Sequence, residues 1–66
     1  MADAQAREIA RGNIEANLSD AVCEDGPDSI FDSALTLAQD ALHDAGCPTD
    51  QIRRVAYEIA TCFAQP

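Results

Sequence analysis

Apolar residues recur at steps of three and four along this chain, and no stretch alternates as a half-buried β-strand would. This spacing puts one apolar stripe on each of three helical segments. The stripes must face one another for their side chains to be buried away from water. Gly26-Pro27 and Gly46-Cys47-Pro48 separate the segments and act as helix stops. The sequence therefore predicts helices over about residues 3–22, 29–45 and 49–63.

Short connections place successive helices antiparallel, so we expect an all-α, three-helix up-down-up bundle in a single domain over residues 1–66. Gly12 weakens the first helix by about 1 kcal/mol relative to alanine. A kink or break at Gly12-Asn13 is therefore an alternative to a continuous helix. The predicted core positions are apolar and lie on one face of each helix: Ala6, Ile9, Ala10, Ile14, Leu18, Ala21, Val22; Ile30, Phe31, Ala34, Leu35, Leu37, Ala38, Ala41, Leu42, Ala45; Ile52, Val55, Ala56, Ile59, Cys62, Phe63.

The charge of the chain is strongly negative and lies mostly in its middle. The chain has twelve acids, four arginines and no lysine, for a net charge of −8. Between Gly12 and Ile52 there are nine acids and no base, whereas the remainder has three acids and four bases. Such a balance argues against direct binding to nucleic acid or to an anionic membrane, since both need cations. It favours a cationic protein partner, or serves only to keep the domain soluble.

The four-residue spacing of Asp3, Arg7, Arg11 and Glu15 places these charges on one face of the first helix. Neighbours at this spacing attract one another by a few tenths of a kcal/mol per pair. We therefore expect them to neutralise one another along the helix.

The residues needed for catalysis or for a cofactor are scarce. Cys23, Cys47 and Cys62 form no Cys-x-x-Cys pair, and the single histidine, His43, has only Cys47 at a metal-binding spacing. We expect no enzyme activity, no metal and no cofactor, in a bacterial cytoplasm where the thiols stay reduced and mostly buried. Cys23 and Cys62 should lie at the same end of the bundle, either as two nearby thiols or as a disulfide.

The segment Gly26-Pro27-Asp28-Ser29-Ile30 resembles the Gly-x-Asp-Ser-Leu signature of acyl carrier proteins. The resemblance implies a phosphopantetheine arm on Ser29, with the acids that follow docking cationic partner enzymes. Those proteins have a longer loop before the serine and a short extra helix before the last one, which this sequence does not predict. Ser29 with Asp32 also fits a Ser-x-x-acid pattern that caps a helix N-terminus.

The acidic side of the second helix and of the segment before it is the remaining candidate site. The residues predicted to bind a partner are Glu24, Asp25, Asp28, Asp32, Asp40 and Asp44, with Glu15 and Asp20 as extensions. Along the helix the charges recur every 6 to 12 Å at a rise of about 1.5 Å per residue. One DNA strand carries a charge about every 3.4 Å, so the helix alone is too dilute to copy a duplex.

A short, lysine-free, acidic helical chain resembles the small anti-CRISPR proteins of phages and mobile elements. The stretches EANLSDAVCEDGPDSIFDS and QDALHDAG carry the resemblance. It implies a monomeric inhibitor that mimics DNA. Such an inhibitor would block target-DNA or protospacer-adjacent-motif binding by a type I CRISPR effector complex, with its carboxylates meeting Lys and Arg on that partner. Two other classes stay open: a carrier protein, and a small antitoxin-like partner that would use Tyr57 beside Arg53 and Arg54.

Overall fold

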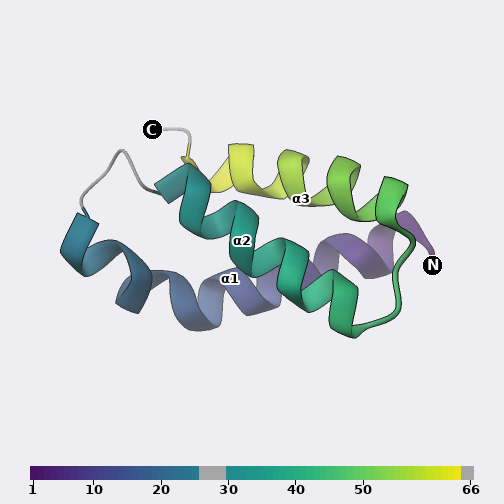
Figure 1. Ribbon diagram of the computed structural model, residues 1–66, viewed down its shortest axis with the longest axis horizontal. Coiled ribbons are helices and arrows are strands. Elements are labelled where there is room, and N and C mark those ends of the chain that lie inside the picture. The colour runs from purple at the N-terminus through teal and green to yellow at the C-terminus, as the bar shows by residue number, and fades with distance from the viewer. Residues whose placement is uncertain (26–29, 65–66) are drawn as a thin grey trace.

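The computed structural model in Figure 1 describes the backbone of residues 1–25 and 30–64, and the side chains of residues 1–18 and 30–64. Within these ranges the chain forms three helices and no strand: α1 (Asp3–Asp25), α2 (Ile30–Asp44) and α3 (Thr49–Ala64). α1 and α3 run in the same direction and α2 runs against both, so the predicted up-down-up bundle is confirmed. None of these helices is long and apolar enough to cross a membrane.

α1 is longer than predicted and passes through Gly12 without a break, ending at Asp25 instead of near residue 22. Ala10 and Ile14, on either side of Gly12, are both fully buried. Their burial offsets the roughly 1 kcal/mol that glycine costs a helix. The kink considered at Gly12 is therefore not found. α2 and α3 match the predicted bounds to within one residue at each end.

α2 ends in a glycine cap that directs the chain back into α3. Gly46 has a φ of +83°, a left-handed conformation that favours glycine. The Gly46 N–H donates to the carbonyl of His43 at 3.1 Å, and the Cys47 N–H donates to the carbonyl of Leu42 at 3.0 Å. This pair of bonds is a Schellman motif. The buried side chains of Cys47 and Leu42 belong to the same core cluster, so the cap also closes this end of the bundle.

Among the described side chains, the core is built largely from alanine, which accounts for six of the twelve buried residues. Because alanine side chains are small, the helix backbones can approach one another closely. Few large side chains are therefore needed to fill the centre. The largest fully buried ones are Ile14, Leu42 and Val55. The cluster comprises Ala6, Ala10, Ile14, Ala34, Ala38, Leu42, Cys47, Ile52, Val55, Ala56, Ile59 and Ala60.

Most of the predicted core positions in the described ranges are buried or half-buried, with two exceptions. Ala45 and Cys62 are exposed. Ala45 follows the last residue of α2, where the chain turns away from the core. Cys62 lies at the side of α3 that faces α1 and lines a groove there. Ala60, which the sequence did not place in the core, is fully buried.

One polar side chain links α1 to α2 inside the bundle. The Asn13 side-chain amide donates to the backbone carbonyl of Leu37 at 2.7 Å, in a partly buried position. Asn17 donates to the backbone and side-chain oxygens of Asn13, at 2.9 and 3.0 Å, and so fixes the orientation of that amide. Among the described side chains, every buried nitrogen or oxygen has a hydrogen-bond partner. The bond from Asn13 therefore connects α1 to the backbone of α2 and leaves that amide satisfied.

Candidate functional site

The solvent-facing side of α2 carries the described part of the predicted acidic surface. Asp32, Asp40 and Asp44 are all exposed, opposite the buried alanines of the same helix. At a rise of about 1.5 Å per residue, Asp32 and Asp40 are roughly 12 Å apart along the axis, and Asp40 and Asp44 roughly 6 Å. Each four-residue step turns by about 40°, so the three carboxylates follow a curved line. We call these three residues the α2 acidic face.

The α2 acidic face is not neutralised within the described part of the chain. α2 contains no lysine or arginine. The two ion pairs among the described residues join α1 to α3 and leave these carboxylates out. Among the described residues, the three carboxylates are therefore exposed without a salt-bridge partner and are available to another protein.

The ion pairs that do form correct the expectation for the first helix. The charges at Asp3 and Arg7 do not pair along α1. Instead, Asp3 accepts two hydrogen bonds from the Arg54 guanidinium, at 2.9 and 3.0 Å. Arg7 donates to Glu58 at 2.9 Å. α1 and α3 run in the same direction and carry these charges at the same four-residue spacing with opposite signs, so each pair forms across the helices.

Asp3 is also part of a hydrogen-bonded chain that begins at Cys47. The Cys47 thiol donates to the side-chain oxygen of Gln51 at 3.2 Å, and the Gln51 amide donates to Asp3 at 2.8 Å and to the carbonyl of Met1 at 2.6 Å. The hydrogen bonds from Arg54, and next the one from Gln51, hold the pKa of Asp3 well below its usual range. This chain fastens the N-terminus to the start of α3.

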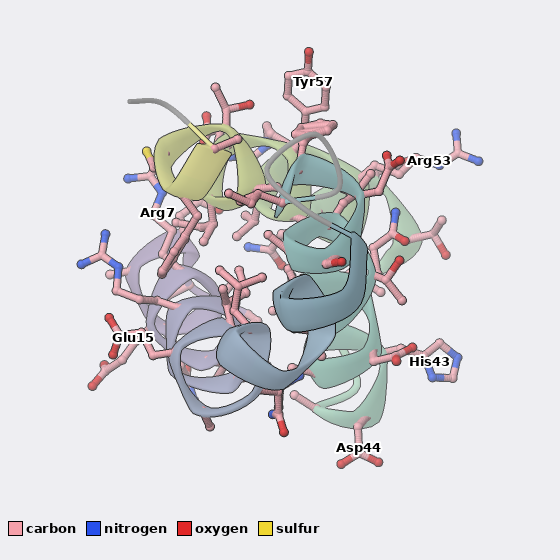
Figure 2. The ribbon with its side chains drawn as sticks, turned by 90° about the vertical axis from the view of Figure 1, so that its left-hand side faces the viewer. Arg7, Glu15, His43, Asp44, Arg53 and Tyr57 are labelled. Atoms are coloured by element: carbon pink, nitrogen blue, oxygen red, sulfur yellow. The ribbon has the colours of Figure 1, made fainter. Side chains whose placement is uncertain are left out.

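The remaining predicted site residues lie elsewhere or outside the described ranges. Glu15 is exposed on α1, and Figure 2 shows it on the side of the bundle opposite His43. It therefore does not extend the α2 acidic face. His43 and Arg53 project to the same side of the bundle in Figure 2. Asp20, Glu24 and Asp25 belong to α1, but their side chains are outside the described part, and Asp28 lies outside it altogether.

The expected departure from acyl carrier proteins is confirmed at α3, which is one helix from Thr49 to Ala64 without a short helix before it. Ser29 itself falls outside the described residues. His43 is exposed while Cys47 is buried, with its thiol directed to Gln51. Among the described side chains, no group of three or more His, Cys, Asp or Glu is close enough to hold a metal.

A groove lies between α1 and α3, which the sequence analysis did not identify. It has a volume of about 450 Å³. The residues that line it are Arg7, Arg11, Tyr57, Glu58, Ile59, Thr61 and Cys62. We call it the α1–α3 groove. Cys62, a free thiol, is exposed here although it was predicted to be buried; its relation to Cys23 lies outside the described side chains.

Two sequence signals could have revealed the groove. Arg7 and Arg11 of α1 lie at the same four-residue spacing as Glu58 and Cys62 of α3. In parallel helices such positions fall opposite one another. Opposite Arg7, the long side chain of Glu58 fills the space between the helices. Opposite Arg11, the short side chain of Cys62 leaves that space open.

Comparison of the chain with protein-family models, with curated proteins and with solved structures finds no match, so its function is inferred from its sequence and geometry.

Proposed function

We propose that the protein is an acidic inhibitor that binds the cationic DNA-binding surface of another protein and competes with DNA there. In its most specific form, it is an anti-CRISPR that blocks target-DNA or protospacer-adjacent-motif binding by a type I CRISPR effector complex. The carboxylates of Asp32, Asp40 and Asp44 substitute for DNA phosphates and meet Lys and Arg of the partner.

The observation that carries the proposal is that the ion pairs formed by the arginines lie away from α2. Arg7 and Arg54 form ion pairs with Glu58 and Asp3, on the side of the bundle formed by α1 and α3. Neither arginine pairs with the α2 acidic face, and α2 itself contains no lysine or arginine. Charge that folding leaves unpaired on one side of a small domain attracts an opposite charge and steers its approach.

The spacing of the carboxylates limits what they can imitate. Steps of roughly 12 and 6 Å along α2 are wider than the phosphate spacing of a DNA strand, about 3.4 Å. Because Glu15 lies on another side of the bundle, a denser array needs Asp20, Glu24, Asp25 and Asp28, which come just before α2. The proposed contact therefore uses a few discrete charges spread along α2, and it should weaken as salt increases.

A competition experiment tests the proposal. Purified type I effector complexes are incubated with labelled target DNA carrying the adjacent motif, and the protein is added at increasing concentration. We expect near-stoichiometric loss of DNA binding at low salt and weaker inhibition at higher salt. If the protein binds none of the complexes, or binds one while its DNA remains bound, the proposed mechanism is wrong.

A separate measurement decides the carrier alternative. The protein is incubated with a phosphopantetheinyl transferase and coenzyme A, and its intact mass is recorded. We expect no change in mass. A gain of one phosphopantetheine arm that disappears in Ser29→Ala would replace the inhibitor proposal with a carrier function.

A further inference from the structure

The α1–α3 groove combines an apolar lining with a positively charged edge. Ile59 forms part of its floor as a member of the core cluster, and Tyr57, which is 61% exposed, stands at its side. Its volume of about 450 Å³ falls within the range of small-molecule sites, which is about 300 to 1,000 Å³. It can therefore hold a small ligand, although not a large substrate.

The charges of the groove differ from those of the rest of the molecule. Arg7 at its edge is already paired with Glu58 at 2.9 Å. Arg11 comes one turn later on α1, where α3 presents the thiol of Cys62 instead of a carboxylate. Within the described part of the chain Arg11 is exposed and forms no ion pair, not even with Glu15 four residues further on. The lining thus holds two guanidinium groups and one carboxylate.

The α1–α3 ion pairs explain why a cation is left over at this point. Asp3 with Arg54 and Arg7 with Glu58 form two successive pairs between the parallel helices. Arg11 continues the series on α1, but α3 supplies no acid to complete it. A guanidinium beside an apolar surface favours a carboxylate, which it can bind through two parallel hydrogen bonds.

We propose that the α1–α3 groove binds a small amphipathic carboxylate, a single carboxylate attached to an apolar chain or ring. The apolar part lies against Ile59 and Tyr57, and the carboxylate is held by Arg11. A single negative charge is the preferred ligand because Glu58 and the overall charge of −8 repel a more highly charged one. Arg7 and His43 lie on opposite sides of the bundle, so this site is independent of the α2 acidic face.

The test uses phenylbutyrate as the probe and phenylbutanol as its neutral counterpart, with binding followed by backbone-amide NMR shifts of the full chain. A ligand of this size should bind with a Kd on the order of 1 mM. We expect saturable shifts centred on Tyr57, Ile59 and Cys62, and at least about fivefold weaker binding of the alcohol.

Arg11→Gln should weaken phenylbutyrate binding by a similar factor and leave alcohol binding unchanged. Arg53→Gln is the matched control, because Arg53 is also an exposed arginine but lies outside the groove. Circular dichroism checks that both variants remain folded. The proposal is wrong if the alcohol binds as tightly as the acid, if the two variants behave alike, or if no saturable shift occurs at about ten times the expected Kd.

Discussion

Replacing each of two glycines by alanine should change the stability of this protein in opposite directions. At Gly46 the φ of +83° is unfavourable for any residue with a Cβ. An added Cβ would meet no atom within 4 Å, so the cost comes from the backbone alone. Holding an L-residue in the left-handed region costs about 1 to 2 kcal/mol. The reduced freedom of the unfolded chain returns about 0.4 to 1 kcal/mol. Gly46→Ala should therefore lower the free energy of unfolding by about 1 kcal/mol.

At Gly12 the same substitution should raise the stability. Gly12 lies inside the continuous helix α1, is exposed, and also has open space where a Cβ would be placed. Alanine in a helix interior is favoured over glycine by about 1 kcal/mol. The two variants should thus differ by about 2 kcal/mol. For a domain of this size, each kcal/mol corresponds to about 4 to 8 °C in Tm.

Thermal and urea unfolding, followed by the helical circular dichroism signal, measure both changes against the unaltered chain. We expect the Tm of Gly46→Ala to fall and that of Gly12→Ala to rise. A neutral or stabilising effect of Gly46→Ala would refute the glycine cap that ends α2. A destabilising effect of Gly12→Ala would show that α1 does not run straight through position 12.

Three further predictions concern the core, the α1–α2 link and the response to acid. Leu42→Ala should lower the free energy of unfolding by about 2 to 5 kcal/mol in urea titrations, because Leu42 is fully buried; a loss below 1 kcal/mol would contradict that packing. Asn13→Ala should cost about 0.5 to 1.5 kcal/mol, measured in the same way, because it removes the hydrogen bond to the Leu37 carbonyl. An unchanged stability would mean that this bond contributes nothing. The pKa of Asp3 is lower in the folded state than its unfolded value of about 3.9, so its pairing with Arg54 stabilises the fold above that pH and is lost as the pH falls below it. Asp3→Asn should flatten the pH dependence of Tm below about pH 4; an unaltered acid profile would argue against the pairing.

Periodicity was sufficient to predict the three helices and most of the core, because burial on one helical face leaves a regular trace in the sequence. It did not predict what depends on the arrangement of helices in space. The four-residue spacing of Asp3 and Arg7 is compatible with pairs along α1, but the ion pairs form with Arg54 and Glu58 across to α3. Only the parallel alignment of the two helices decides between these possibilities.

The candidate site, too, could be predicted from the sequence only where it does not depend on how the helices are arranged in space. The helical spacing predicted that Asp32, Asp40 and Asp44 face away from the apolar stripe, and all three are exposed. The direction in which Glu15 points depends on the rotation of α1 in the bundle, which the spacing of residues does not specify. The α1–α3 groove also escaped prediction, because it results from a short side chain at Cys62 next to two long ones on the neighbouring helix.

The central claim is that the location of the charge on α2, and not the net charge of the chain, carries the inhibition. Two triple variants separate these possibilities, and each removes three exposed carboxylates. The first is Asp32→Asn, Asp40→Asn and Asp44→Asn; the control is Glu8→Gln, Glu15→Gln and Asp50→Asn. Each includes one acid in the first turn of a helix, so the loss of interaction with the helix dipole is matched.

Both variants are measured for displacement of target DNA from a type I effector complex that the unaltered protein inhibits. Three exposed contacts at about 0.5 to 1 kcal/mol each predict that the α2 variant is about ten- to hundredfold weaker. The control should inhibit within about twofold of the unaltered protein. Equal inhibition by the two triple variants would contradict the account, since only overall charge would then matter.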